Sequence, residues 1–560
     1  MSTTEVLIKF EDLNFYSFFT KYSLMEEYGF SSGLMSRIFR KILPIAPDSN
    51  TIEYVLLQKK EAVPFLLSLL DLNTIADSYI SQQLVLSIKA LCAKVVAFGI
   101  DSNIKAKYNS LELTSKPFED LLEKINNLDG CTDSEGKALM ASLDSIILLI
   151  NQLRKNKNKI GTNFHLTITT TKILEYTFRI KELLDLKINL GSRKHWESMF
   201  LKHAEYLKIR DSVRRYIRRN SDLLALVIVE HTSNKGQKYI AENRKEYWSF
   251  FYKSLLGGSI ISIFALVKLY IDSFELMQFK NALFFSLNYA LCFITVKQLG
   301  GIIATKQPAM TASTIAKNID KRGDLQIDSI NSIIVLTRKV FRSQFISIIG
   351  NFIMAFSLAC LSMYILQYFG SDKLSSIVKP RYLIKNVVPS TQLIFFAAIA
   401  GIFLALSGLI SGYVDNKVVA SKIAHRIRYN TLFFKSKRLA TYAEKKAGAL
   451  VGNISLGFLL GSCFLLSNLL PFEVDIRHIA FSSSYVGYSI MSYDYNLDTI
   501  ILALLGALLI GLINFLVSFS ITLYLALKSR GASFKLIPKI VFNILKDFAF
   551  NPLYYFYKIE

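Results

Sequence analysis

Residues Thr499–Leu527 read TIILALLGALLIGLINFLVSFSITLYLAL and contain no charged side chain. A helix needs about 20 residues to cross the ~30 Å hydrocarbon core of a bilayer, so this stretch is long enough to span one. A soluble helix of the same length would carry a charged face, and this stretch has none. The sequence therefore predicts a transmembrane helix here.

Five other stretches have the same character, because each is apolar over about 20 residues or more and has no Asp or Glu in its interior. They are Ser249–Ile271, Met277–Ala304, Phe345–Tyr368, Ser390–Val414 and Ala449–Leu470. The sequence therefore predicts an all-α, polytopic membrane protein whose six transmembrane helices all lie within residues 246–531.

The residues before these stretches have a different composition, since residues 1–245 are rich in Lys, Glu, Asp and Asn. Apolar residues recur there at steps of three and four, which is the spacing of an amphipathic helix. They do so over Val63–Leu72, Leu84–Val96, Ser142–Leu153 and Ile173–Leu190. The sequence predicts a mostly helical cytoplasmic region over residues 1–245 and a cytoplasmic tail over residues 532–560.

The formal net charge of +23 is unevenly distributed between the connections. Membrane proteins place Lys and Arg in cytoplasmic connections. Residues 305–344, 415–448 and 528–560 contain seven, nine and six Lys and Arg, whereas residues 272–276, 370–389 and 471–498 contain none, four and one. This alternation predicts that both termini lie in the cytoplasm.

The stretch Arg193–Arg219 is strongly basic and contains Trp196, Phe200, Tyr206 and Tyr216. Such a surface could bind anionic phospholipid or nucleic acid. A solvated amphipathic helix near the membrane would have the same composition. We favour this interpretation over lipid contact, and lipid contact over nucleic acid.

No motif for metal, cofactor or covalent chemistry is recognisable in the sequence. The five cysteines show no CxxC pair and no metal-ligand spacing with the six histidines. There is no GxxxxGK[ST], HExxH or GxSxG string. The string DIRHIAFSSS (Asp475–Ser484) brings an acid, a histidine and three serines together. We interpret it as chance proximity in a polar loop, because geometry rather than adjacency assembles a catalytic triad.

Small and amide residues inside the apolar stretches predict how the helices pack. Small-xxx-small pairs let helices approach closely in a membrane. They occur at Gly408–Gly412, Gly448–Gly452, Gly457–Gly461 and Ala507–Gly511. We also expect Asn288, Asn351, Asn453 and Asn514 to form hydrogen bonds between helices, and Lys268 and Lys297 to extend toward the interface.

Several strings are similar to those of a known family. They are His231–Tyr239 (HTSNKGQKY) with Arg244–Tyr247, Ala304–Ala312 (ATKQPAMTA), Gly408–Asn416 (GLISGYVDN), Asp475–Tyr488 (DIRHIAFSSSYVGY) and Gly511–Gly531 (GLINFLVSFSITLYLALKSRG). Through them the chain resembles the bacterial polytopic proteins of the site-specific recombinase family, over at least residues 220–531. The resemblance implies a multi-pass protein of the bacterial inner (cytoplasmic) membrane, and the family's name implies DNA strand exchange.

The residues do not support that chemistry. A tyrosine recombinase needs two arginines, a His-x-x-Arg pair and a tyrosine converging on one phosphate. The string His425–Arg428 (HRIR) has this spacing, with Tyr429 or Tyr442 downstream, but it lies in a connection between two predicted spans. A serine recombinase needs a serine flanked by arginines in its N-terminal domain, and residues 1–120 contain no such cluster. We therefore name no catalytic residue.

Three functions remain open at this point. The first is a non-catalytic inner-membrane protein with a structural, envelope or lipid-contacting role. The second is a transporter or lipid-translocating protein, and the third is a DNA-acting recombinase. We predict no cofactor or metal and expect the lipid bilayer as partner. The candidate site residues, of unknown role, are the polar residues of the matched strings: Lys306, Gln307, Asp415, Asn416, Asp475, Arg477, His478 and Ser482.

Overall fold

The computed structural model describes residues 16, 19, 20, 79–128, 132–156, 164–210, 240–274, 276–305, 327–369, 377–429, 436–463, 465, 477–529 and 536–558. All regular structure within them is helical, which confirms the predicted all-α class. The chain divides into two compact units, Met1–Leu224 (unit 1) and Ala225–Glu560 (unit 2). Each unit is described by itself.

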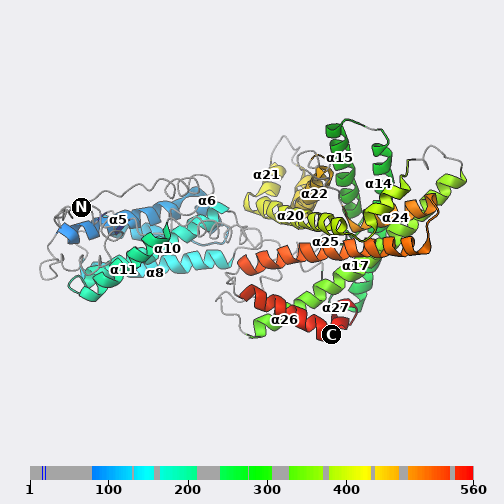
Figure 1. The fold of residues 1–560 in the computed structure, drawn as a ribbon. Coiled ribbons are helices and arrows are strands. Elements are labelled where there is room, and N and C mark those ends of the chain that lie inside the picture. The colour runs from blue at the N-terminus through cyan, green and yellow to red at the C-terminus, as the bar shows by residue number, and fades with distance from the viewer. Residues whose placement is uncertain are drawn as a thin grey trace, which may run out of the picture. The chain divides into compact units, whose positions relative to one another are not determined.

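The described part of unit 1 is a set of amphipathic helices (Figure 1). They are α5 (Tyr79–Ile100), α6 (Ser102–Asn109), α7 (Lys116–Asn126), α8 (Asp133–Lys155), α10 (Phe164–Ile188) and α11 (Arg193–Arg210). The apolar repeats predicted as helices lie on α5, α8 and α10, which confirms those predictions, while Val63–Leu72 is outside the described residues.

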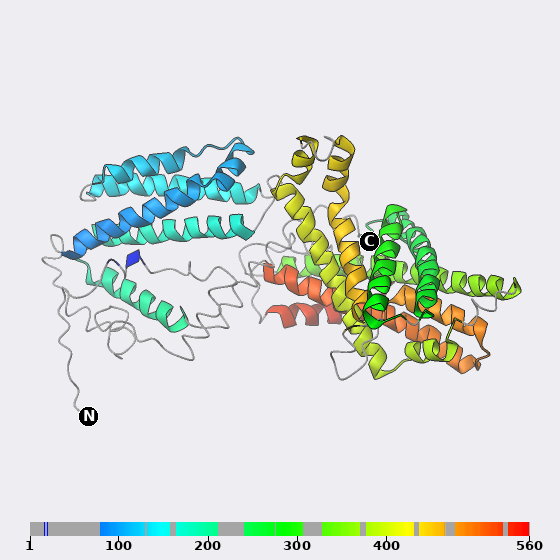
Figure 2. The ribbon, with the colours of Figure 1, turned by 90° about the horizontal axis from the view of Figure 1, so that it is seen from above.

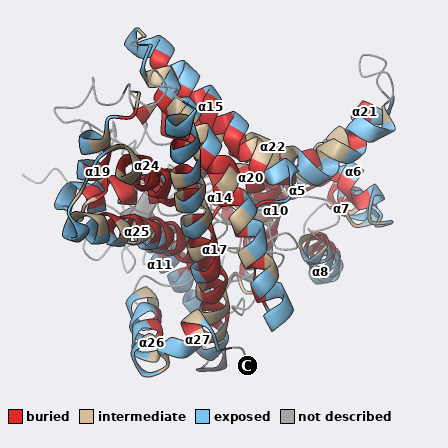
Figure 3. Ribbon diagram, turned by 90° about the vertical axis from the view of Figure 1, so that its right-hand side faces the viewer, coloured by how far each residue is buried: buried red, intermediate tan, exposed pale blue. Residues whose placement is uncertain are grey.

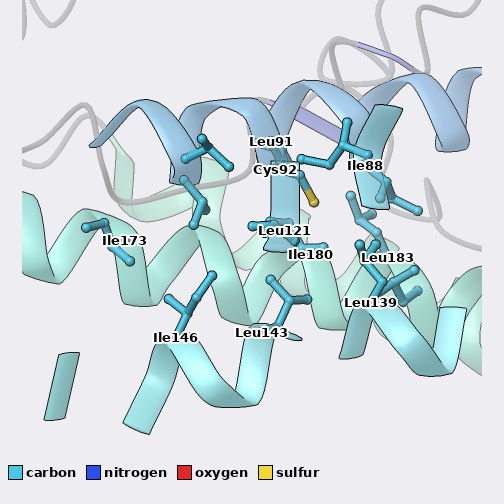
Figure 4. Packing of buried hydrophobic residues seen from close by; sticks show 14 of the residues in the cluster. Ile88, Leu91, Cys92, Leu121, Leu139, Leu143, Ile146, Ile173, Ile180 and Leu183 are labelled. Carbon is cyan, nitrogen blue, oxygen red and sulfur yellow. The ribbon is translucent and has the colours of Figure 1, made fainter. Parts of the chain in front are cut away.

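The core of unit 1 consists mainly of Leu and Ile side chains from α5, α7, α8 and α10. Figure 4 shows Ile88 and Leu91 of α5 above Leu143 and Ile146 of α8, with Ile180 of α10 among them. Such burial stabilises a fold by about 25 cal/mol per Å² of apolar surface removed from water. The described helices of unit 1 therefore share one continuous apolar core.

Helix α11 holds the first part of the basic stretch Arg193–Arg219. Trp196 and Phe200 are fully buried in the unit 1 core, and the indole Nε1 of Trp196 donates to the Leu190 carbonyl at 2.9 Å. These two aromatic residues are therefore not available to stack on nucleic acid bases. Residues 211–219 are outside the described residues.

The described helices of unit 2 range from 5 to 42 residues and are drawn from green to red in Figure 2. They are α14 (Arg244–Asp272), α15 (Gln278–Gln298), α17 (Ile327–Tyr368), α19 (Pro380–Val387), α20 (Thr391–Ala420), α21 (Ile423–Tyr429), α22 (Lys437–Gly461), α24 (Ile479–Ser492), α25 (Leu497–Ser529), α26 (Leu536–Phe550) and α27 (Pro552–Phe556). The last two occupy the region predicted as a tail.

Five of the six predicted spans coincide with helices that are long and apolar enough to cross a membrane, namely α14, α15, α17, α20 and α25. The protein is thus a polytopic α-helical membrane protein. Helices α5 and α8 of unit 1 also satisfy these criteria of length and composition. The sixth predicted span, Ala449–Leu470, begins inside α22, which starts with the charged residues Lys437 and Arg438 and ends at Gly461.

Two predictions about the connections were wrong. The predicted span Met277–Ala304 is helical only to Gln298, and residues 301–305 pack against α14 and α17 instead. There the Ile302 amide donates to the Lys253 carbonyl at 3.0 Å, and the Ala304 amide donates to the Asn351 side chain at 3.2 Å. The predicted polar loop around Asp475–Ser484 contains the start of α24, a buried helix.

Glycines let the unit 2 helices approach one another closely. A Cβ at Gly448 or Gly452 would overlap Ser411 of α20, and one at Gly457 or Gly461 would overlap the backbone of α15. Both small-xxx-small pairs of α22 therefore lie at helix contacts, as the sequence predicted.

The four asparagines predicted to link helices all do so. Their Nδ2 atoms donate to main-chain carbonyls of other segments: Asn288 to Phe264, Asn351 to Ser254 and Ile302, Asn453 to Phe293, and Asn514 to Ala397 and Arg477. The donor–acceptor distances are 2.7–3.0 Å. In a bilayer, bonds of this kind hold helices together where water exclusion cannot.

The unit 2 helices define two ends of a bundle. At one end, which we call the Asp272 end, Lys379 lies 3.6 Å from Asp272, and Arg381 donates to the Tyr493 hydroxyl at 2.6 Å. This end holds the connections α14–α15, α17–α19 and α24–α25, which are the connections with few Lys and Arg. At the other end, Lys446 donates to Gln298 at 2.9 Å.

Candidate functional site

Helix α24 begins in the middle of the bundle and ends at the Asp272 end. With 14 residues it is about 21 Å long, which is too short to cross a bilayer. It runs in the same direction as α17, since Ser484 donates to the Ala355 carbonyl and the Gln367 side chain donates to the Met491 carbonyl. Figure 3 shows α24 among the buried segments of unit 2.

The composition of α24 explains how this helix can be buried. Three of its five serines donate to carbonyls one turn back: Ser483 to Ile479 at 2.7 Å, Ser484 to Ala480 at 2.9 Å and Ser492 to Tyr488 at 2.7 Å. These bonds remove the cost of burying a hydroxyl. Gly487 sits against the Phe356 carbonyl of α17, where a Cβ would lie only 2.7 Å away.

The residues that precede α24 lie deep in the bundle. Asn514, near the middle of α25, donates to the Arg477 carbonyl at 3.0 Å. The Arg477 side chain is 4% exposed, and its guanidinium lies 5.1 Å from the centre of the Phe396 ring. His478 is fully buried, with its ring 6.1 Å from those of Phe293 and Phe481.

A cavity of about 140 Å³ lies beside α24, between α14, α15 and α19. Its polar lining consists of Lys268, Asp272, Lys379, Tyr382, Asn386, Arg477, Ser482 and Tyr485. Apolar side chains of the same helices complete the wall, among them Leu269, Phe285 and Leu383. The two predicted site residues Arg477 and Ser482 therefore share one pocket.

This pocket has an exposed rim and a buried floor. At the rim, the side chains of Lys379 and Asp272 are 63% and 42% exposed and form the 3.6 Å ion pair. At the floor, Arg477 and Ser482 are both buried. A ligand entering from the Asp272 end would thus meet the ion pair first and the buried guanidinium last.

Lys268 lies within an aromatic cage in the same pocket. Its ammonium is 5.2 Å from the Phe285 ring centre, 5.5 Å from Tyr485 and 5.9 Å from Tyr289. Each ring face attracts a cation by roughly 0.5–2 kcal/mol, more where water is excluded. The rings therefore stabilise a positive charge that lies inside the apolar stretch of α14.

The other predicted site residues lie elsewhere. Asp415 and Asn416 are buried at the end of the bundle opposite Asp272, where the Gly448 amide donates to Asp415 at 3.1 Å and joins α20 to α22. Asp415 thus has a structural position. Lys306, Gln307 and Asp475 are outside the described residues.

Lys268 and Lys379 also line the pocket but are not among the site residues predicted from the sequence. Lys268 was expected only to extend toward the interface, and Lys379 was counted as a loop charge. A signal was nevertheless present, because Lys268 lies one helical turn before Asp272 at the end of an otherwise apolar stretch. Lys268 and Lys379 share a pocket with Arg477 only because of where α24 lies. No local sequence pattern predicts the position of that helix.

The candidate recombinase residues lie on α21 and α22 and have the following partners. His425 and Arg428 lie on α21, where Arg428 is 3.8 Å from Glu444 and the His425 ring packs on Tyr429 at 4.6 Å. The Tyr442 hydroxyl instead accepts a hydrogen bond from Gln298 at 2.6 Å. Within the described residues, no group of three or more His, Cys, Asp or Glu could hold a metal ion.

Fold and pocket together define a class: a multi-pass α-helical membrane protein with a cationic pocket inside its helix bundle. The chain belongs to a family described as "Site-specific recombinase", whose model matches residues 3–557, in agreement with the resemblance seen in the motifs. No curated protein and no solved structure matches the chain.

Proposed function

We propose that this chain is a non-catalytic membrane protein that binds the anionic headgroup of a lipid in the pocket beside α24. The observation that supports this most is the charge of the lining: Lys268, Lys379 and Arg477 face one carboxylate, Asp272. Ionisable residues within membrane spans are costly and usually mark a ligand site or an ion path. Lys and Arg together are the residues that recognise a phosphate group.

The size of the pocket favours a headgroup over a larger ligand. A volume of about 140 Å³ accommodates a phosphate group with a few waters. It does not accommodate an entire lipid, so the acyl chains would lie outside, against the apolar surface of the helices. The role would therefore be lipid contact rather than chemical conversion.

The pocket opens at the end of the bundle whose connections contain few Lys and Arg. By the positive-inside rule, this end lies outside the cytoplasm and both termini lie inside. We place the protein in the bacterial inner membrane, with the pocket facing the leaflet away from the cytoplasm. An envelope-related role would follow from this orientation.

Translocation of the same anionic lipid is a second candidate function. It is favoured by the depth of Arg477, whose carbonyl bonds to Asn514 near the middle of α25. A headgroup bound at that depth would already be partway across the bundle. DNA strand exchange has no comparable support, because Arg428 pairs with Glu444 and the Tyr442 hydroxyl bonds to Gln298.

Binding of defined lipids to the full-length protein tests the proposal. Native mass spectrometry of the detergent-purified chain would compare phosphatidylglycerol with phosphatidylcholine, and glycerol phosphate would serve as a soluble competitor. We expect Arg477→Gln and Lys268→Gln each to weaken phosphatidylglycerol binding about tenfold or more, since hydrogen bonds to charged groups contribute about 1.5–3 kcal/mol. Lys385→Gln removes the same charge from α19 outside the pocket, so it should change nothing.

The alternatives give different results. Equal phosphatidylglycerol binding by all three variants and the parent would refute the proposal. Full displacement of the lipid by millimolar glycerol phosphate would identify a soluble anion as the ligand. Duplex DNA bound by the whole protein in nanodiscs, with an affinity that falls steeply with salt, would instead support the name of the family.

A further inference from the structure

The last two helices of the chain have one face packed on unit 2 and one exposed apolar face. On the packed side, Arg338 of α17 donates to both carboxylate oxygens of Asp547, at 2.8 and 2.6 Å. Tyr555 donates to the same carboxylate at 2.8 Å, and its ring contacts Phe341 of α17. Helices α26 and α27 are therefore attached to unit 2 by specific contacts.

The opposite face of α26 is apolar and exposed. Val541, Phe542 and Leu545 are 40%, 64% and 61% exposed. Phe542 follows Val541 by one residue and Leu545 follows it by four, so the three side chains lie on one side of the helix. Lys539 and Lys546, seven residues apart, are both exposed and lie together along one flank of this side. Large apolar side chains rarely share an exposed face unless something other than water covers it.

We propose that α26 and α27 lie in the plane of the bilayer interface and bind an anionic lipid surface. An amphipathic helix with Phe and Leu on one face and Lys beside it is the chemistry that inserts among headgroups. With 15 residues, α26 is too short to span the membrane. The flanking lysines would attract acidic lipid headgroups.

Chain length places α26 near the membrane independently of its composition. The spanning helix α25 ends at Ser529, and α26 begins at Leu536. Seven residue steps extend at most about 25 Å, so α26 begins close to the end of a membrane-spanning helix. Connectivity thus keeps the first residue of α26 within about 25 Å of the end of α25.

Exposed aromatic residues provide a second marker for the interface. Trp248 and Tyr252, near the start of the spanning helix α14, are 46% and 65% exposed, and such residues concentrate at the headgroup level. Tyr247 beside them donates to the Phe556 carbonyl at 3.2 Å, and its ring lies 6.1 Å from that of Tyr557. The end of α27 is therefore at the same level as this aromatic group.

Depth measurements on the full-length protein in nanodiscs test this proposal. A polarity-sensitive fluorophore would be attached to single cysteines, Phe542→Cys or Leu545→Cys, after replacement of the five native cysteines. Ile263→Cys on the exposed face of α14 is the lipid control, and Glu123→Cys on α7 of unit 1 is the water control. We expect nitroxide at the headgroup level to quench the two α26 probes more strongly than Ile263→Cys, nitroxide deep in the acyl chains to quench Ile263→Cys more strongly, and aqueous iodide to quench Glu123→Cys most.

Two outcomes would overturn the proposal. Quenching of the α26 probes by iodide as strongly as Glu123→Cys would mean that the face lies in water. Protection from both quenchers would mean that protein covers it, either unit 1 or a second copy of the chain. The anionic preference has its own test: probe emission should be more blue-shifted with phosphatidylglycerol than with phosphatidylcholine. The double variant Lys539→Gln, Lys546→Gln should abolish this difference, and its persistence would refute the role of charge.

Discussion

Units 1 and 2 are both helical, and both contain helices long and apolar enough to span a bilayer, but different contacts hold them together. In unit 1, large aliphatic side chains of α5, α8 and α10 interdigitate. In unit 2, glycines bring helices together and asparagines bond across them. Close approach at glycines together with amide bonds between helices is the arrangement that holds helices together in a bilayer.

The outward faces show the same difference. Helix α8 of unit 1 exposes Lys137, Asp144 and Gln152, whereas α14 of unit 2 exposes Tyr252, Ile263 and Val267. Length and mean hydropathy alone do not separate these helices, since both meet the criteria for a span. The chemistry of the exposed face differs, since charged and amide side chains lie there on α8 and apolar ones on α14.

The largest expected effect comes from a charge on each exposed face. Ile263→Asp should raise the free energy of membrane insertion by about 3–4 kcal/mol, because this side chain meets lipid. Leu148→Asp on α8 should change the free energy of unfolding by no more than about 0.5 kcal/mol, because this side chain does not. The measurement is the fraction of full-length protein extracted as folded monomer from membranes. Equal losses for both variants would mean that α8 also faces lipid, and the contrast between the units would fail.

Glycine substitutions should give the next largest effect. A Cβ at Gly257 would overlap the Ile302 carbonyl, whereas one at Gly136 of α8 would have nothing within 4 Å. Gly257→Ala should therefore destabilise unit 2 by roughly 1–3 kcal/mol, and Gly136→Ala should be neutral or stabilise unit 1 by up to about 1 kcal/mol. Thermal unfolding in detergent would compare the two variants. A stable Gly257→Ala protein would contradict the close approach of these segments.

Asparagine substitutions sharpen the same comparison within unit 2. Asn351 makes three hydrogen bonds, to Ser254, Ile302 and Ala304, whereas Asn288 donates one, to Phe264. At about 0.6 kcal/mol per bond in a membrane, Asn351→Leu should cost about 2 kcal/mol and Asn288→Leu about 0.6 kcal/mol. Unfolding by sodium dodecyl sulfate titration would rank them. The reverse order would show that these amides do not hold the bundle.

The smallest effects are expected at ion pairs. The Arg338–Asp547 pair is largely shielded, with side chains 16% and 13% exposed, whereas Lys202 and Glu182 of unit 1 form an exposed pair at 3.0 Å. Asp547→Asn should weaken docking of α26 by about 1–2 kcal/mol and Glu182→Gln should cost about 0–1 kcal/mol. Protease protection of residues 536–558 would report the docking.

The same carboxylate gives docking a pH dependence. Hydrogen bonds from Arg338 hold the pKa of Asp547 below its ordinary value. Because the pKa of Asp547 is lower in the docked state, the ionised carboxylate stabilises docking fully above about pH 3.9. This stabilisation is lost as the pH falls through the docked-state pKa. Protection of α26 should therefore decrease only in acid, and Asp547→Asn should remove this dependence. Loss of protection near neutral pH would point to another group.

Much of this fold could be predicted because lipid imposes a simple rule on sequence. A run such as Thr499–Leu527 allows no other interpretation, and amides within such runs must find carbonyls on neighbouring helices. Helix α24 could not be predicted this way, since its serines resemble a polar loop unless their bonds to carbonyls one turn back are known. The pocket was missed for the same reason, because Lys268 and Arg477 are 209 positions apart and meet only once α24 is in place.

The half-length of α24 also has a consequence for biogenesis. A segment of 14 residues that contains five serines is a poor substrate for direct transfer from the translocon into lipid. It is made before α25, yet it packs against α14, α17 and α25. The pocket lining comes from α14, α15, α19, α24 and the residues beside them, so the pocket can form before α25 is inserted, whereas the bond from Asn514 that fixes the Arg477 main chain can form only afterwards.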